Sequence, residues 1–319
     1  MYNVTRKEGR ALPLKKVKSK QHVSKGHKGK FFNRKQREKI SSGLFIAPSF
    51  LGVLIFFLVP FMVVIYYSMV DNPISGNFVF LENYANVLDN AAFKTAVRNT
   101  AVFSALAVPL AVVLSLMLAI VLEAKLPFRS QFRTFFLSPM MVPVASVVLI
   151  WQVLFHYNGA VNEMFAAFGG GKIDWMKSEY SIVVIVILFL WKNLGYNMII
   201  FMAALANIPK DILEVAQLEN STPFKTFWYI KLRYLSSTIL FVTIMSLISS
   251  FKIFREIYLL TTDYPYDTIY MLQHYMNNKF RNLDYQALSA AAILMSLVMI
   301  VIIGALFLVE NHFGKDVEG

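Results

Sequence analysis

Six apolar stretches, each long enough to cross a bilayer as a helix, constrain this chain more than any other feature of its sequence. A helix needs about 20 mostly apolar residues to span the hydrocarbon core. The stretches predicted to be membrane helices cover residues 44–70, 99–122, 132–155, 181–206, 236–260 and 287–309. Pro139 and Pro143 are expected to bend the third helix, which neighbouring helices make tolerable in a membrane. The sequence therefore predicts an all-α integral membrane protein with six transmembrane helices.

Charge is concentrated at the start of the chain. Residues 1–43 contain 14 of the 31 Lys and Arg but two of the 19 Asp and Glu, so the remainder carries no net charge. Only 16% of all residues are charged, against about 25% in soluble domains. We predict a basic, disordered cytoplasmic tail over residues 1–43, a transmembrane domain over 44–309 and a cytoplasmic C-terminus over 310–319. Such a tail is typical of contact with anionic lipid rather than with nucleic acid.

The distribution of Lys and Arg among the loops predicts the orientation. The two ends of the chain and the loops after the second and fourth helices hold 22 Lys and Arg, against 6 on the other side. Because short cytoplasmic loops are enriched in these residues, both termini are predicted to be cytoplasmic.

Several kinds of chemistry are excluded by the sequence. There is no cysteine, and none of the five histidines has metal-ligand spacing relative to another, so we expect no metal site. A phosphate-binding loop needs Gly, four residues, Gly-Lys and Ser or Thr. The one approximation to it, Gly169–Lys172, has Ala166 and Ile173 at two of the required positions. The chain is therefore predicted to have no catalytic residue and no nucleotide site.

The loop after the fourth helix, residues 207–235, is predicted to form two short amphipathic helices. Asp211 favours the start of the first helix, and Asn220 is suited to a left-handed turn after it. Thr222 then offers an N-cap, and Pro223 suits the first position of the second helix. Such a hairpin either lies on the membrane surface or fits a groove on a cytoplasmic partner, and the physical arguments favour neither.

Glu214-Val215-Ala216, Asn220 and then Phe227, Ile230 and Leu232 resemble the EAA loop of ABC-importer permeases. Three positions depart from the pattern of that family, since Val215 replaces Ala, Asn220 replaces Gly and Arg233 replaces Pro. The run GLFIAPSFLGVLIFFLVPF, Asn83-Tyr84 and Tyr258–Thr261 are also similar to sugar-importer permeases. Over residues 40–309, the chain resembles the first permease of the maltose- and glycerol-phosphate-type pairs.

The resemblance implies a type I ABC importer permease in a bacterial plasma membrane. It implies as partners a second homologous permease, two copies of a cytoplasmic ATP-binding subunit and an extracytoplasmic solute-binding protein. ATP and Mg²⁺ would be used by the ATP-binding subunit, with no cofactor bound by this chain, and the solute would be a carbohydrate, most simply an oligosaccharide. The residues implied in coupling to the ATPase are Glu214, Val215, Ala216, Leu218, Asn220, Ser221 and Phe224.

Polar residues inside the predicted membrane helices are candidates for the solute pathway, because such residues are costly in a bilayer. They and their aromatic neighbours are Trp191, Lys192, Asn193, Tyr196, Asn197, Phe251, Lys252, Arg255 and Glu256. Lys252 and Glu256, four residues apart, are expected to pair along one helix. The alternative is structural pairing or snorkelling without contact to solute. Three cations against one carboxylate suggest an acidic solute.

The hydrophilic segment 263–286 is predicted to be extracytoplasmic and carries Tyr264, Tyr266, Tyr270 and Tyr275. These tyrosines either contact the solute-binding protein or form an interfacial aromatic belt. Three other functions remain as alternatives. One is a permease for glycerol-phosphate or a polyol; another is a membrane enzyme, for which no catalytic cluster is present. The third is a stand-alone secondary transporter, for which we would expect internal repeats, and none is visible.

Overall fold

The computed structural model describes residues 34–123 and 128–313. Most of the predicted tail, Lys125 and the last six residues therefore lie outside the described residues. The chain divides into two compact units, residues 1–58 and 59–319. Each unit is described by itself.

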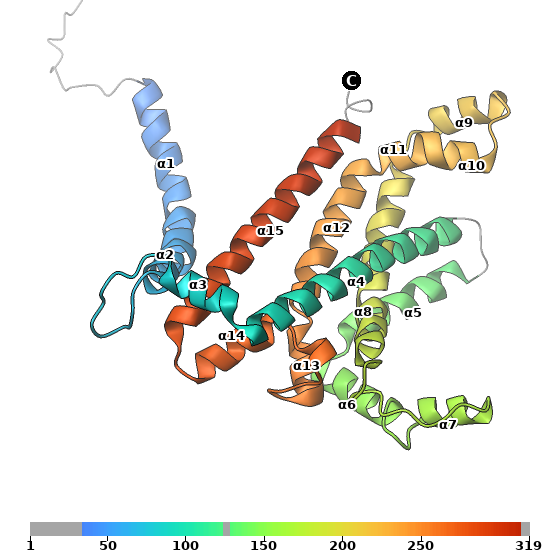
Figure 1. The fold of residues 1–319 in the computed structure, drawn as a ribbon. Coiled ribbons are helices and arrows are strands. Elements are labelled where there is room, and N and C mark those ends of the chain that lie inside the picture. Colours follow the sequence, from blue (N-terminus) through green and yellow to red (C-terminus); the bar gives the residue numbers. More distant parts are fainter. Residues whose placement is uncertain (1–33, 124–127, 314–319) are drawn as a thin grey trace, which may run out of the picture. The chain divides into compact units, whose positions relative to one another are not determined.

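Helices form nearly all of the regular structure of the described residues. In chain order they are α1 (Arg34–Val53), the π-helical turn η1 (Leu54–Leu58), α2 (Val59–Ser68), α3 (Glu82–Asp89), α4 (Ala91–Glu123), α5 (Arg129–Met141), α6 (Val144–Leu154), α7 (Ala160–Ala167), α8 (Ser181–Ala206), α9 (Lys210–Leu218), α10 (Pro223–Thr226), the π-helical turn η2 (Phe227–Lys231), α11 (Leu232–Tyr234), α12 (Ser236–Phe251), α13 (Phe254–Thr261), the 3₁₀ turn η3 (Asp267–Ile269), α14 (Leu272–Arg281) and α15 (Tyr285–Phe313) (Figure 1). Extended backbone pairs at one isolated bridge in this part of the chain, between Val70 and Phe78.

Five helical segments of the described residues are long and apolar enough to cross a membrane. They are Ser42–Ser68, Ala91–Glu123, Ser181–Ala206, Ser236–Thr261 and Tyr285–Asn311. A sixth crossing is available if α5 and α6 form one broken span. This number and the absence of a named strand in the described residues confirm the predicted all-α membrane fold.

The third predicted helix is broken rather than gently bent. α5 and α6 meet at 99°, and Val142 between them is extended, with ψ 130°. Pro143 disfavours helical backbone at Val142 and supplies no backbone N–H of its own. A proline-induced bend is thus confirmed, but the single helix predicted over residues 132–155 is wrong.

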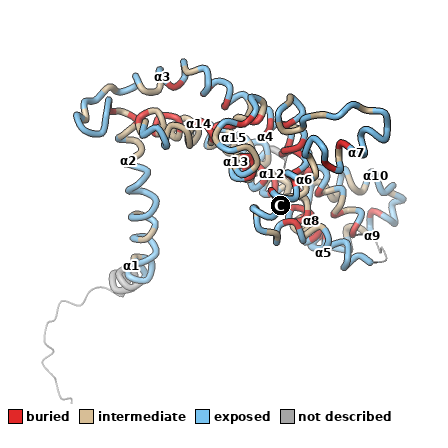
Figure 2. Tube along the Cα trace, turned by 90° about the horizontal axis from the view of Figure 1, so that it is seen from below, coloured by how far each residue is buried: buried red, intermediate tan, exposed pale blue. Residues whose placement is uncertain are grey.

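The first unit consists, where it is described, of α1 and η1. Its apolar side chains are mostly exposed, including Phe45 at 84% and Phe56 at 75%. Figure 2 shows the described part of α1 mainly pale blue. From Leu44 on, the helix carries no charged residue and is uncovered by its own unit, which is typical of a helix surrounded by lipid or by other membrane helices.

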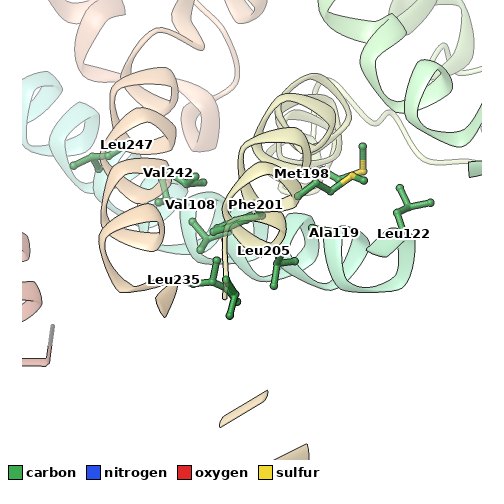
Figure 3. Close-up of a cluster of buried hydrophobic side chains, with 12 residues drawn as sticks. Val108, Ala119, Leu122, Met198, Phe201, Leu205, Leu235, Val242 and Leu247 are labelled. Carbon is green, nitrogen blue, oxygen red and sulfur yellow. The ribbon is translucent and has the colours of Figure 1, made fainter. Parts of the chain in front are cut away.

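The core of the second unit lies where α4, α8 and α12 pack side by side. Figure 3 shows its largest buried cluster, with Val108 from α4, Phe201 and Leu205 from α8 and Val242 from α12. Phe201 and Val242 are fully buried. Leu235, just before α12, closes the same cluster. This core therefore positions the end of α8 and the start of α12, which are the two ends of the loop over residues 207–235.

Candidate functional site

The loop over residues 207–235 forms the predicted helical hairpin. Asn220 has φ 54°, the left-handed conformation that asparagine adopts more readily than most residues. Its N–H donates to the Gln217 carbonyl at 3.0 Å, and the Ser221 N–H donates to the Ala216 carbonyl at 3.0 Å. These two hydrogen bonds form a Schellman C-cap, which ends α9. The turn predicted at Asn220 is therefore present.

The second helix of the hairpin begins as its sequence predicts. The Thr222 side chain accepts a hydrogen bond from the backbone N–H of Lys225 at 3.4 Å, and Pro223 occupies the first helical position. The chain then passes through the π-helical turn η2. Aromatic packing supports this segment, because the rings of Phe224 and Trp228 stack with centroids 6.2 Å apart.

The hairpin is joined firmly to the helix core. Ile208 and Leu235, at its two ends, are buried in the main cluster, and Leu213 packs against that cluster. Lys231 Nζ donates to Glu123 Oε2 at 2.8 Å, linking η2 to the end of α4. Both side chains of this ion pair are partly shielded from solvent. A displacement of the hairpin would therefore also displace α4, α8 and α12.

The outer side of the hairpin exposes apolar side chains. Leu218 is 83% exposed, Phe224 73% and Val215 54%. Glu214 and Asn220 are exposed, Ser221 is half-buried and Ala216 is buried. A hollow of about 340 Å³ lies beside them, lined by Asp211, Ile212, Val215, Ala216, Glu219, Ser221 and Ile230. The predicted coupling residues thus form one protruding surface, apart from Ala216, which packs inside it.

A break in the fifth apolar segment creates the second site. α12 ends at Phe251 and α13 begins at Phe254. Across the break, the N–H groups of Lys252, Arg255 and Glu256 donate to carbonyls three residues earlier, at 3.1–3.3 Å. This is the tighter 3₁₀ pattern, which changes the direction in which side chains leave the helix. Ile253 is buried and holds the break against the core.

Glu256 pairs with Lys192 of α8 and not with Lys252. Lys192 Nζ donates to Glu256 Oε1, and the side chains are 20% and 8% exposed. The predicted pairing of Lys252 with Glu256 is wrong because it assumes a continuous helix, whereas the 3₁₀ break separates the two residues. Lys252 and Arg255 are left exposed.

A hollow of about 330 Å³ surrounds this ion pair. Six of the nine predicted pathway residues line it, together with Met140, Phe189, Ser249 and Ile253: the six are Lys192, Asn193, Tyr196, Lys252, Arg255 and Glu256. The hollow therefore combines an aromatic hydroxyl, an amide and more cations than carboxylates.

Three predicted pathway residues lie elsewhere. Trp191 packs against Trp151, with ring centroids 5.2 Å apart. Asn197 is buried and its amide donates to Ser246 Oγ at 2.9 Å. Phe251 packs against the main core cluster. All three occupy structural positions between helices in this structure.

Met140 was missed by sequence reasoning because it reaches the hollow from α5. Its approach depends on Gly195 of α8, where a Cβ atom would overlap the carbonyl oxygen of Phe136. Glycine thus lets the two helix backbones touch. Ser249 was also missed, although it lies three residues before Lys252, a spacing that predicts the same helix face.

The tyrosine-bearing segment 263–286 is partly helical. It contains η3 and α14, and Tyr275 packs against Phe93 with ring centroids 5.3 Å apart. Tyr275 is buried, so it is available neither to a partner protein nor to a lipid belt, whereas Tyr264 is 77% exposed. Burial raises the pKa of Tyr275 to about 12. Tyr264 and Tyr266 remain candidates for a surface role.

His274 is fully buried in the same segment. Its Nδ1 accepts a hydrogen bond from the Met271 N–H at 3.2 Å, and its ring lies edge-on to Phe254. Burial lowers the pKa of His274 to about 4, against a smaller opposing effect of Asp263. The imidazole is therefore neutral at physiological pH and acts as a packing group.

Neither a metal nor a nucleotide site is visible in the part of the chain that the structure describes. No group of three His, Cys, Asp or Glu is placed there to hold a metal ion. Gly169–Lys172 is a surface loop, and Lys172 Nζ donates to Asn158 Oδ1 and Glu163 Oε1, both at 3.1 Å. The two sites identified above are thus a protruding hairpin and a charged hollow among the membrane helices.

Comparison with known proteins shows which family and which relatives this chain resembles. The family described as "Binding-protein-dependent transport system inner membrane component" matches residues 107–318. The arabinooligosaccharides transport system permease protein AraP of Bacillus subtilis is 28% identical over 70% of this chain and 72% of its own length. The lactose transport system permease protein LacF of Rhizobium radiobacter is 28% identical over 87% of this chain and 95% of its own.

Two further similarities extend the comparison. The sn-glycerol-3-phosphate transport system permease protein UgpA of Agrobacterium fabrum is 26% identical over 86% of this chain and 97% of its own. A solved chain of a bacterial ABC transporter for the acidic polysaccharide alginate superposes with a TM-score of 0.75 at 19% identity, over 90% of this chain and 100% of that one. At this identity the superposition establishes a shared fold.

Proposed function

Because the chain belongs to the family of binding-protein-dependent transport system inner membrane components, we propose that it is the permease subunit of an ATP-driven importer of a carbohydrate. The observation that carries this proposal is the similarity to LacF, which extends over 87% of this chain and 95% of that relative. AraP, named for arabino-oligosaccharides, supports the same solute class. The protein is a multi-pass component of a bacterial inner membrane, and its proposed solute is an oligosaccharide.

The proposed assembly contains a second homologous permease, two copies of an ATP-binding subunit and a solute-binding protein. A solved relative of the same fold is described in complex with a periplasmic protein bound to an alginate pentasaccharide, which supports the last of these partners. This chain would be non-catalytic, and the ATP-binding subunit would use ATP and Mg²⁺.

The hairpin is proposed to couple the permease to the ATPase. Val215, Leu218 and Phe224 leave apolar surface exposed on the hairpin, and an exposed apolar patch marks a contact with a protein partner or with the membrane. Insertion of this surface into a groove of the ATP-binding subunit would cover it. Movement of the hairpin would then reach α4 through the ion pair of Lys231 and Glu123, and would reach α8 and α12 through the shared core.

The charged hollow is proposed to be part of the solute pathway. Tyr196 and Asn193 offer an aromatic surface and an amide to a sugar, and Lys252 and Arg255 are exposed cations. Since Glu256 is already paired with Lys192, its carboxylate does not cancel those two charges. We therefore extend the proposal to an acidic oligosaccharide.

A second candidate solute is glycerol-phosphate. The similarity to UgpA over 86% of this chain favours it, and the same two cations would suit a phosphate group. If neither anionic solute is carried, the solute would be a neutral oligosaccharide or a polyol.

The proposed domain organisation follows from this assembly. Residues 1–43 would form a cytoplasmic tail, 44–309 the permease domain with its coupling loop at 207–235, and 310–319 a cytoplasmic C-terminus. With both termini in the cytoplasm, the hairpin lies on the side of the ATPase, as coupling requires.

The proposal is tested by purifying the chain from native membranes in a mild detergent and identifying its partners by mass spectrometry. We expect a second permease and an ATP-binding subunit, and ATP-dependent uptake of an oligosaccharide when this complex and its binding protein are reconstituted in vesicles. Recovery of the chain alone, with solute uptake that needs no ATP, would instead identify a stand-alone transporter.

A further inference from the structure

The segment between α6 and α8 contains an uncovered apolar stripe. Val161, Met164, Phe165 and Phe168 follow one another at spacings of three, one and three residues, which places them on one face of α7 and its C-terminal end. Met164 is 66% exposed, Phe165 43% and Phe168 88%. The opposite face carries Glu163 and Ala167, which are also exposed. α7 is thus amphipathic, and among the described residues none covers most of its apolar side.

The stripe is held on a fixed scaffold. Asn162 is fully buried, and its Nδ2 donates to the carbonyls of Tyr157 at 2.9 Å and Ile173 at 2.7 Å. Its Oδ1 accepts from the Ile173 N–H at 3.2 Å and from Trp175 Nε1 at 2.8 Å. All the usual hydrogen-bonding capacity of the amide is used, so one side chain ties α7 to the loop on both sides of it.

The connections of α7 restrict where it can lie. α6 ends at Leu154, five residues before the N-cap of α7, and α8 begins at Ser181. Taken as one broken span, α5 and α6 cross the membrane once before α8 crosses it again, so the segment between α6 and α8 starts and ends at the same membrane face. Figure 1 shows α7 running across the direction of α8, at the end of the bundle opposite the hairpin of α9 and α10. A helix so placed lies near the plane of the interface.

The surroundings of α7 have the composition of a membrane interface. Tyr157 and Tyr180 are about half exposed, at 49% and 54%, and Trp175 packs against Phe165 with ring centroids 6.2 Å apart. Lys177 is exposed on the same loop, whereas Lys172 is paired with Glu163. Tyrosine and tryptophan concentrate at the headgroup level, and lysines there attract lipid phosphates.

We propose that α7 is an interfacial membrane anchor, with Met164, Phe165 and Phe168 buried at the boundary between headgroups and acyl chains of the leaflet predicted to be extracytoplasmic. An amphipathic helix of this kind binds by the apolar area that it buries in the interface. The anchor fixes one end of α6. The other end of α6 is the 99° break from α5, and Met140 of α5 lines the charged hollow. Contact with lipid would thus restrain α6, one of the two helices that meet at this break beside the proposed solute pathway.

The chain contains no cysteine, so single labels can be introduced without altering other sites. Met164→Cys and Phe168→Cys are compared with Glu163→Cys and Ala167→Cys, each spin-labelled in the assembled transporter. Vesicles of phosphatidylethanolamine and phosphatidylglycerol are the probe. We expect the ratio of collisions with oxygen to collisions with a water-soluble nickel chelate to be severalfold higher at 164 and 168 than at 163 and 167.

Two results would overturn the anchor. Equal and high access of the nickel chelate at all four positions would place α7 in water. Labels at 164 and 168 that are immobilised and shielded from both reagents would mean that a protein covers the stripe. Repeating the measurement with and without the solute-binding protein then identifies whether that protein is the cover. Uptake by each labelled variant confirms that it is folded, so a null result reflects the position of α7.

Discussion

Lys192 of α8 and Glu256 of α13 form an ion pair across 64 residues of sequence, at the wall of a charged hollow. Glu256 is 8% exposed and Lys192 20%. Such a pair contributes little net stability relative to a well-packed apolar pair, but leaving one partner alone is costly because a buried charge loses its counter-charge. This asymmetry makes the pair testable.

Replacing only one partner of the pair should destabilise the protein more than replacing both. For Glu256→Gln we expect a loss of roughly 2–4 kcal/mol in the free energy of unfolding, slightly below the full range for buried pairs because Lys192 retains some solvent. The double variant Lys192→Gln with Glu256→Gln should recover most of that loss. Denaturant unfolding in detergent measures both. A double variant as unstable as the sum of the two single ones would contradict the pairing.

The sequence predicted helix positions well wherever apolar length alone decides them. The span over residues 181–206 is α8 at the same boundaries, since polar or charged residues flank both ends. α4 starts at Ala91, well before residue 99, because its first turns are amphipathic. Asn90 Oδ1 accepts from the Phe93 N–H at 3.2 Å, and Phe93 is buried. A hydropathy window does not register such a start, whereas the cap at Asn90 was readable.

The turn of the hairpin should be sensitive to side-chain shape at Asn220. At φ 54°, Asn220→Gly is expected to be neutral or slightly stabilising, whereas Asn220→Val should cost about 1–2 kcal/mol because a β-branched residue is strained in the left-handed region. Gln217→Val, an exposed position inside α9, is the matched control and should cost under about 1 kcal/mol. Thermal unfolding in detergent compares them. Equal losses at the two positions would show that the turn is not left-handed in solution.

Docking of the hairpin should depend on its exposed apolar side chains. Leu218→Asp places a charge on a side chain that is 83% exposed, so we expect the permease to fold normally but to lose most of the ATP-binding subunit during purification. Lys210→Gln, at the exposed start of the same helix, is the control and should retain it. The measurement is the number of ATP-binding subunits that co-purify per permease for each variant. Full recovery of the ATPase with Leu218→Asp would place the docking surface elsewhere.

His274 should make stability depend on pH in acid. Its pKa is about 4 in the folded protein and about 6.5 when unfolded, so the unfolded state binds more protons between these values. Stability contributed by the neutral buried ring is therefore complete above about pH 6.5 and falls as the pH drops toward 4, by about 3 kcal/mol in total. The charged group that acts on the ring is Asp263, which is itself paired with Arg281. His274→Leu should flatten the pH dependence of unfolding in this window. An unchanged slope would assign the acid lability to other groups.

The candidate sites were predictable in composition but not in arrangement. Local motifs specified the hairpin because each step, from Asn220 to Pro223, is decided by neighbours in sequence. The hollow depends on contacts between distant segments, such as Gly195 against Phe136 and the pairing of Lys192 with Glu256. Such contacts have no local signature. The helix break after Phe251 also has no proline or glycine that would predict it from the sequence. Because of this break, Glu256 pairs with Lys192 and not with Lys252 as helical spacing had predicted.

Charge selectivity should follow Lys252 and Arg255, the two exposed cations of the hollow. A unit charge about 4 Å away contributes about 1 kcal/mol in water, so each cation is worth about fivefold in affinity for an anionic solute. Lys252→Gln with Arg255→Gln should therefore lower the uptake of an acidic oligosaccharide about 25-fold, while leaving a neutral one of the same length nearly unchanged. Arg98→Gln, an exposed arginine of α4 outside the hollow, serves as the control and should affect neither. Competition between the two oligosaccharides in reconstituted vesicles gives the ratio directly. If the uptake of both solutes falls equally, the cations hold the helices together and do not select the solute. If uptake stays complete and the ratio of acidic to neutral oligosaccharide is unchanged, the basis for an acidic solute is removed.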